Sequence, residues 1–402
     1  MTMADASITP IPVSKTQSVA CATVRDPRLD FFRGIAMFII LIAHVPNDWL
    51  ALWIPARFGF SDATETFVFC SGMASAIAFG RVFRTRGLAM GTARVGFRVW
   101  QVYWAHIALF FAIAATMVAL NTVLPEGRDY VGQLNLYPFF KDAQTNLLGL
   151  ITLTYVPNYF DILPMYLVIL AMMPVMYALA RVHVALALSA SVALWLFVQV
   201  TGWNLPAEPW SEREWFFNPF GWQLIFFTGF ALMSGWTPAP PVDRRLFWIA
   251  VTVILISLPF AYFRIFNAFP VFLEWRKEFD ILIQKSDFGV LRYVHFLATA
   301  YVAWVLVGQK GARLLPSGAA TLSANVWAVV LKVIMKVGQQ SLAVFIASMY
   351  FARLLGVLFD HVGRTHVSMI WVNALGFAII IAVAFGAAWF KSAPWKSKRG
   401  AV

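Results

Sequence analysis

The stretch RGIAMFIILIAH, residues 33–44, decides the fold of this chain. It sets Arg33 and His44 eleven residues apart, with nothing charged between them, in the first hydrophobic segment. At about 100° and about 1.5 Å per residue, a helix returns both side chains to one face and places His44 about 16 Å deeper than Arg33. Because an ionisable group at that depth of a membrane is costly, we interpret His44 as functional; packing against a neighbouring helix is the alternative.

The composition is that of a polytopic membrane protein. Of 402 residues, 60% are hydrophobic and only 12% are charged, which excludes an ordinary soluble domain. The net charge of +12 suggests nucleic acid, but the basic residues sort by membrane side, so we expect no nucleic-acid partner. The two cysteines indicate no disulfide framework, and no residue spacing resembles a metal site, a phosphate loop or a hydrolase triad.

Apolar stretches of about 17 to 25 residues predict an all-α bundle of about ten transmembrane helices. We place them near residues 31–47, 64–80, 99–121, 162–180, 184–201, 219–235, 246–262, 290–308, 337–356 and 367–390. Lys and Arg concentrate on the side that holds both chain ends, so the positive-inside rule predicts that both termini are cytoplasmic. The domains follow as a disordered tail at 1–26, one transmembrane domain at 27–392 and a basic tail at 393–402.

Two long connections fall on the opposite, outer side. The first, 121–161, contains LLGLITLTYVP, which is apolar but too short to span, so we expect a re-entrant or interfacial piece. The second, 264–289, mixes charges with aromatic residues and is expected to lie across the mouth of a cavity. Passive surface loops are the alternative for both connections.

Polar residues on the first helix predict one continuous seam. Spacings of 3, 7, 11 and 18 return near one angle, which unites Asp30, Arg33, Met37, His44 and Asp48 on a single face. Pro46 should interrupt the helix just beyond His44 and open this end onto a cavity. A neutral imidazole there could take a proton from a hydroxyl, while Arg33 suits phosphate or carboxylate; snorkelling to the interface is the alternative for Arg33.

Further candidates fall on the two sides of the membrane. Arg94 and Arg98 share a helix face on the cytoplasmic side and could hold donor phosphates beside Arg33, with membrane anchoring as the alternative. Tyr166, just inside the fourth span, is grouped with them as a donor-binding residue. On the acceptor side we place Glu65, Asp161 and His295, and helix capping is the alternative for the aspartate.

Five stretches in order resemble one family. They are RDPRLDFFRGIAMFIILIAH, ETFVFCSG, ARVGFRVWQVYWAH, DILPMYLVILAMMPVMYALA and GQQSLAVFIAS. Together they are similar to the OpgC proteins, bacterial inner-membrane enzymes that succinylate osmoregulated periplasmic glucans and are related to the acyltransferase 3 superfamily. Two positions depart from the superfamily pattern: Glu65 stands where Asp is usual, and Ser348 stands where many members have His, so no role of that His transfers.

The resemblance implies a membrane acyltransferase. A succinyl-CoA or acetyl-CoA donor would enter from the cytoplasm, with no permanently bound cofactor, and a periplasmic glucan hydroxyl would be acylated. By this resemblance His44 would be catalytic, with Arg33 as its partner in donor binding or positioning. We group Asp48 with them because a carboxylate close to His44 would favour the protonated imidazole. A succinyl donor also demands a cation for its free carboxylate, for which Arg94, Arg98 or Arg292 are candidates.

The sequence is also compatible with two other functions. The first is a secondary transporter or glucan export channel with an Arg33, His44 and Asp48 pathway. The second is an interaction subunit for glucan synthesis. Membrane lipids are partners in every case, glucan-synthesis proteins are further candidates, and the oligomeric state is left open.

Overall fold

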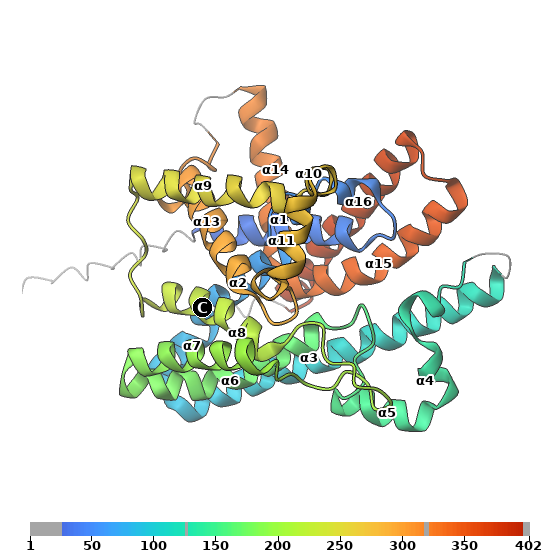
Figure 1. The fold of residues 1–402 in the computed structure, drawn as a ribbon, viewed down its shortest axis with the longest axis horizontal. Coiled ribbons are helices and arrows are strands. Elements are labelled where there is room, and N and C mark those ends of the chain that lie inside the picture. The colour runs from blue at the N-terminus through green and yellow to red at the C-terminus, as the bar shows by residue number, and fades with distance from the viewer. Residues whose placement is uncertain (1–25, 125–127, 317–320, 397–402) are drawn as a thin grey trace, which may run out of the picture.

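The computed structural model describes residues 26–124, 128–316 and 321–396. Within these ranges the chain forms helices and connecting loops and no β-strand, which confirms the predicted all-α class (Figure 1). The predicted tails at 1–26 and 393–402 lie mostly outside the described residues.

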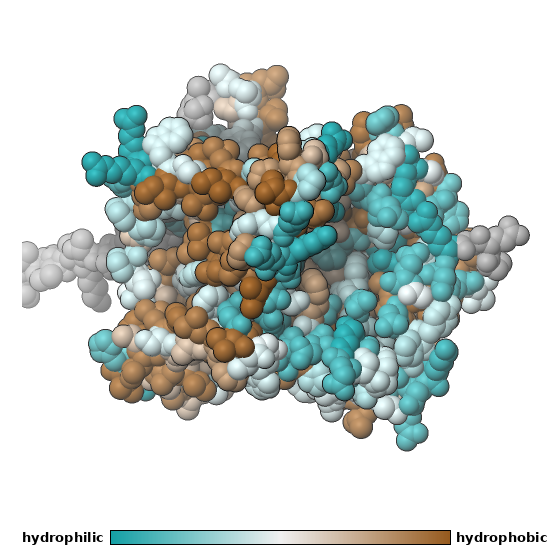
Figure 2. Space-filling model, in the orientation of Figure 1, coloured by the Kyte–Doolittle hydropathy of each residue, from teal (hydrophilic) through white to brown (hydrophobic). Residues whose placement is uncertain are grey.

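Eight helical stretches in the described part of the chain are long and apolar enough to cross a membrane. The bundle is built from α1 (Pro27–His44), α2 (Ala63–Ser75), α3 (Arg81–Val123), α6 (Ile162–Val182), α7 (Val184–Thr201), α8 (Pro219–Ser234), α9 (Arg244–Ala261), α13 (Val290–Val307), α14 (Leu322–Gln339), α15 (Ser341–Val362) and α16 (His366–Ser392). Apolar side chains gather over α6, α7 and α9, whereas polar ones gather over the end that carries α4 (Tyr137–Lys141) and α5 (Ala143–Thr152) (Figure 2). That contrast is typical of a protein whose sides face lipid and whose end faces water.

The segment between the second and third expected spans is helical, and our prediction of a basic loop there was wrong. A π-helical turn, Ala76–Gly80, joins α2 to α3 directly. The break in direction comes at Gly87, whose φ of +80° and ψ of 178° are non-helical. A glycine adopts this backbone without the steric cost that a Cβ would bring.

The expected ninth span, 337–356, corresponds to a helix that begins four residues later, because two helices meet there. α14 ends at Gln339 and α15 begins at Ser341. Figure 1 shows α14 running across the direction of α1 and α9 instead of along it. Its Lys332 and Lys336, expected in a loop, alternate with apolar residues on a helix whose Val329 is 62% exposed.

Glycines let the central helices approach closely. A Cβ on Gly34 of α1 would lie 2.1 Å from the carbonyl oxygen of Ile334, and one on Gly338 would lie 1.9 Å from that of Asp30. A Cβ on Gly72 of α2 would lie 1.9 Å from the Phe226 carbonyl oxygen of α8. A larger side chain at any of these positions would force the helices apart.

The start of α1 and the end of α16 lie at one end of the bundle. Gln339 donates to Asp30 of α1 at 3.1 Å, and the neighbouring Gln340 accepts from Lys391 of α16 at 2.6 Å. The GQQS motif, residues 338–341, therefore supplies hydrogen bonds between helices. We call this the inner end and the opposite one, which carries α4 and α5, the outer end.

The outer connections fold into short helices. α5 covers the first part of the apolar stretch in 121–161 and ends where Leu153 takes a φ of +60°. The 264–289 connection forms α10 (Phe263–Ala268), α11 (Pro270–Glu278) and α12 (Asp280–Ile283). These pieces bring loop residues to the outer ends of α1 and α2.

Candidate active site

His44 is the last residue of α1, and its tautomer is fixed by the backbone. Its Nδ1 lies 2.7 Å from the carbonyl oxygen of Ile40, one turn earlier. Since a carbonyl can only accept, Nδ1 carries the proton and donates it. The other ring nitrogen, Nε2, therefore keeps a free lone pair, which is the form of imidazole that acts as a general base.

A tyrosine and an arginine hold the imidazole in place. The ring of Tyr159 meets His44 edge-on with centroids 5.4 Å apart, and its hydroxyl donates to the Met349 carbonyl at 2.6 Å. The Arg353 guanidinium lies 5.5 Å from the Tyr159 ring centre, and Gln133 accepts from it at 2.8 Å. Tyr159 adopts a φ of +88°, which is strained for a residue with a Cβ; such strain concentrates at functional sites.

His44 opens into a cavity of about 520 Å³ at the outer end of α1. This volume is within the range of small-molecule sites. Its walls come from α1, α2, the start of α6, α15 and connecting loops, among them the loop between α12 and α13 that carries Lys285. The polar residues among them are His44, Asp62, Thr64, Asn158, Tyr159, Asp161 and Lys285.

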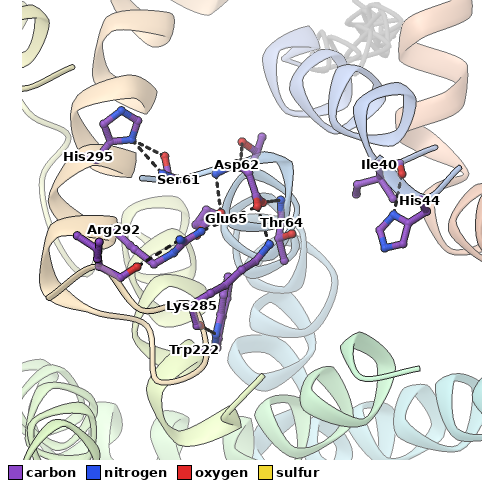
Figure 3. A network of polar contacts seen from close by, with 12 residues as sticks. Ile40, His44, Ser61, Asp62, Thr64, Glu65, Trp222, Lys285, Arg292 and His295 are labelled. Atoms are coloured by element: carbon purple, nitrogen blue, oxygen red, sulfur yellow. Dashed lines mark hydrogen bonds and ion pairs between the residues drawn. The ribbon is translucent and has the colours of Figure 1, made fainter. Parts of the chain in front are cut away.

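Opposite His44 lies a network of paired charges around the start of α2 (Figure 3). Asp62 and Glu65 form a capping box: Asp62 accepts from the Thr64 N–H at 2.6 Å, and Glu65 accepts from the Asp62 N–H at 2.7 Å. Lys285 lies 2.6 Å from Asp62, and Arg292 lies 2.6 Å from Glu65. Burial alone would raise the pKa of Asp62, but Lys285 and Arg292 outweigh it and hold that pKa well below its usual range.

Two of the predicted acceptor-side residues lie behind the cavity wall. Glu65 is completely buried and pairs with Arg292, so it supports the wall and does not line it. His295 is also buried, and its Nδ1 lies 2.7 Å from the Ser61 hydroxyl. A Cβ on Gly59 would lie 2.2 Å from the His295 Nε2, so this histidine packs under the loop that carries Asp62.

Asp161, the third predicted acceptor-side residue, does line the cavity. It stands at the N-cap position of α6 but makes no capping hydrogen bond, so capping was the wrong alternative. Its Oδ1 is buried without a hydrogen-bond partner among the described residues. Burial raises the pKa of Asp161 to about 6, although Arg213 and nearby backbone N–H groups act in the opposite direction.

Asp48 does not share the face of His44, and this part of the predicted seam was wrong. α1 ends at His44, two residues before Pro46, so the helical spacing that linked the two residues does not continue. Asp48 instead caps a short 3₁₀ turn, Trp49–Leu52, by accepting from the Leu50 N–H at 2.9 Å. It is absent from the residues that line the cavity.

Arg33 lies at the inner end among other cations. Its guanidinium donates to the hydroxyl of Ser341, the first residue of α15. Arg98 of α3 and Lys391 of α16 lie close enough to interact with it electrostatically, as does Tyr166 of α6. The structure thus brings together Arg33, Arg98 and Tyr166 from the predicted donor group.

The structure does not bring Arg94 into this cluster, and it does not show a continuous polar seam along α1. Arg94 is exposed and lies over the Phe97 ring at 5.8 Å. Met37, midway between Arg33 and His44, is completely buried, so the polar seam is interrupted in this conformation. Inner cations and outer cavity are two separate sites at opposite ends of one helix.

Several cavity residues were missed by the sequence reasoning. Asp62 had a signal, because Asp-x-x-Glu before an apolar run is a capping-box pattern. Lys285 falls in the connection expected to cross a cavity mouth, but nothing singled it out. Tyr159 had no signal, since its role depends on a backbone conformation that only the fold reveals.

Fold and site together define a polytopic helical membrane protein with a histidine-lined cavity at one end and a cluster of cations at the other. The family model described as OpgC protein matches residues 25–392, nearly the whole chain, so the chain belongs to the OpgC family. Membership suggests an acyltransferase role related to osmoregulated periplasmic glucans. Searches of curated proteins and of solved structures find no significant match.

Proposed function

We propose that this protein is a membrane O-acyltransferase that moves a succinyl group from cytoplasmic succinyl-CoA to hydroxyls of periplasmic glucans. The observation that carries the proposal is the free Nε2 of His44 in the outer cavity, fixed by the Nδ1–H bond to Ile40. The family match and the resemblance support the choice of acyl group and acceptor.

The reaction follows from the tautomer of His44. Nε2 takes the proton of a glucan hydroxyl as the hydroxyl oxygen attacks the thioester carbonyl carbon, which forms the new C–O bond. The resulting tetrahedral intermediate collapses by breaking the C–S bond. The departing CoA sulfur takes the proton back from Nε2, which restores the neutral imidazole. The positive charge that His44 holds between these two steps lies in a cavity that Asp62 and Asp161 also line.

The inner cations supply a site for the other end of the donor. Arg33, Arg98 and Lys391 lie close enough to interact electrostatically, and arginine pairs well with phosphate oxygens. A CoA phosphate held there leaves the acyl arm to extend along α1 toward His44, a distance of about 16 Å. In this proposal Met37 and its neighbours move aside when the donor binds.

The proposal also sets the location and the sides. We place the chain in the bacterial inner membrane with both termini cytoplasmic. Two observations support this: the contacts of Asp30 and Lys391 put the start of α1 and the end of α16 at the inner end, and the basic residues gather there. The cavity then faces the periplasm, where the glucan is.

The test is an assay of the purified protein with succinyl-CoA and a glucan, with acylated product detected by mass spectrometry. We expect transfer, and we expect His44→Gln to lower it by about 10²- to 10⁴-fold through loss of the base. His361→Gln is the matched control, because its Nδ1 makes the same contact to the carbonyl one turn earlier, at 2.9 Å, but lies off the cavity. Unaltered transfer by a folded His44→Gln protein would contradict the assignment.

A further inference from the structure

Lys285 presents a cation to the cavity from a fixed position. Its backbone carbonyl accepts from the Trp222 indole N–H at 2.9 Å, which anchors the loop before α13. Its ammonium lies 5.5 Å from the centre of the Phe217 ring. It also lies 2.6 Å from the Asp62 carboxylate (Figure 3). An ammonium has three donors, and Asp62 takes one of them.

Arg292 cannot play the same part. Its Nε and one terminal nitrogen donate to Glu65 at 2.8 and 2.6 Å, and its other terminal nitrogen lies 3.4 Å from the Ile283 carbonyl. It is only 9% exposed and does not line the cavity. Of the two cations in the network, Lys285 is the one that lines the cavity and is accessible to a ligand there.

The inner cations are also in the wrong place to bind the acyl group. Arg33 and Arg98 lie about one membrane leaflet away from His44, since the 11 residues between Arg33 and His44 rise about 16 Å. The acyl carbon must reach His44 for transfer. A charge at the far end of a short acyl chain therefore lies within the outer cavity and meets a cation there.

We propose that the Lys285 ammonium binds the free carboxylate of a dicarboxylic acyl group and thereby selects succinyl over neutral acyl groups. This inference rests on the proposed acyltransferase function. Asp62 competes for the same ammonium, and Arg292, 3.9 Å from the Asp62 carboxylate, compensates that carboxylate when Lys285 turns to the ligand. The network joins two carboxyl groups and two cations, and Lys285 is the cation that turns to the ligand.

The test compares succinyl-CoA with butyryl-CoA, which has the same chain length and no charge. We expect Lys285→Met to lower kcat/KM for succinyl-CoA about 10- to 100-fold, the effect of losing one charge-assisted hydrogen bond, and to change it less than about 3-fold for butyryl-CoA. Lys285→Arg should keep the preference for succinyl-CoA. Lys277→Met, on the exposed face of α11, is the matched control and should leave both donors unchanged.

A second variant separates binding from support of the fold. Asp62→Asn removes the competitor and should lower KM for succinyl-CoA, whereas a purely structural pair predicts that Asp62→Asn and Lys285→Met harm both donors alike. Parallel loss with both donors, or a wild-type protein that does not prefer succinyl-CoA over butyryl-CoA, would overturn the assignment of Lys285. A wild-type protein that transfers no acyl group at all would overturn the proposed function itself.

Discussion

The two ends of α1 differ in how they handle charge. At the outer end, Asp62 and Glu65 each have a cation within 2.6 Å, and His44 faces them across a cavity. At the inner end, three cations, Arg33, Arg98 and Lys391, lie around one another near Asp30. A balanced network suits an uncharged sugar and a single acyl carboxylate, whereas an excess of cations suits phosphate. In our proposal the outer end therefore serves the acceptor and the inner end binds the donor.

The largest effect we expect is on the free energy of unfolding, through the buried Asp161 at the outer end. The pKa of Asp161 in the folded protein is about 6 against an ordinary value of 3.8, because the carboxyl is buried. Protonated Asp161 therefore contributes its full stability below about pH 4, and this contribution is lost as the pH rises through 6. This rise in the pKa of Asp161 corresponds to at most about 3 kcal/mol in the free energy of unfolding.

Asp161→Asn removes that pH dependence. We expect the variant to unfold at a higher temperature than the wild type at pH 8, and the two to converge as the pH falls toward 4. Thermal unfolding in detergent across this range measures it. Wild type and variant that keep a constant difference at every pH would show that Asp161 is not the buried acid described above.

A smaller effect is expected at the inner end. Arg33→Met should raise KM for succinyl-CoA about 10- to 100-fold through lost contacts to phosphate, and leave KM for the glucan unchanged. Arg28→Met is the matched control, because this arginine of the same helix is already paired with Asp26 at 2.5 Å. Steady-state kinetics with each substrate varied in turn measures the two KM values. An equal rise in the KM values for succinyl-CoA and for the glucan would contradict a specific role of Arg33 in donor binding.

The sequence predicted the helices that local pattern controls. Apolar length located α6, α7, α9, α13 and α16, and the spacing of Arg33 and His44 placed them at different depths along α1. The same reasoning failed for Asp48, because it continued the helical angle past a helix end that Pro46 had already marked. It also failed for α14, whose alternating lysines and valines were taken for a loop.

The cavity partners of His44 were harder to predict for a physical reason. Lys285 and Tyr159 come from loops, and their positions depend on Trp222 and on a positive φ, not on a periodic pattern. Contacts between residues over a hundred positions apart, such as that of Asp62 with Lys285, follow from how the helices pack. A periodic pattern finds the helix that carries a site, whereas packing determines what faces it.

The claim that the two ends serve different substrates is tested most directly in sealed proteoliposomes. Succinyl-CoA is placed on one side of the bilayer and glucan on the other, or both are placed outside only. Because neither substrate crosses the bilayer, we predict acylated glucan in the first arrangement, from the protein molecules whose inner end faces succinyl-CoA. In the second arrangement we predict none, because in either orientation one of the two sites receives no substrate. Product formed with both substrates on the same side alone would contradict access from two sides, and glucan crossing without acylation would point to a transporter.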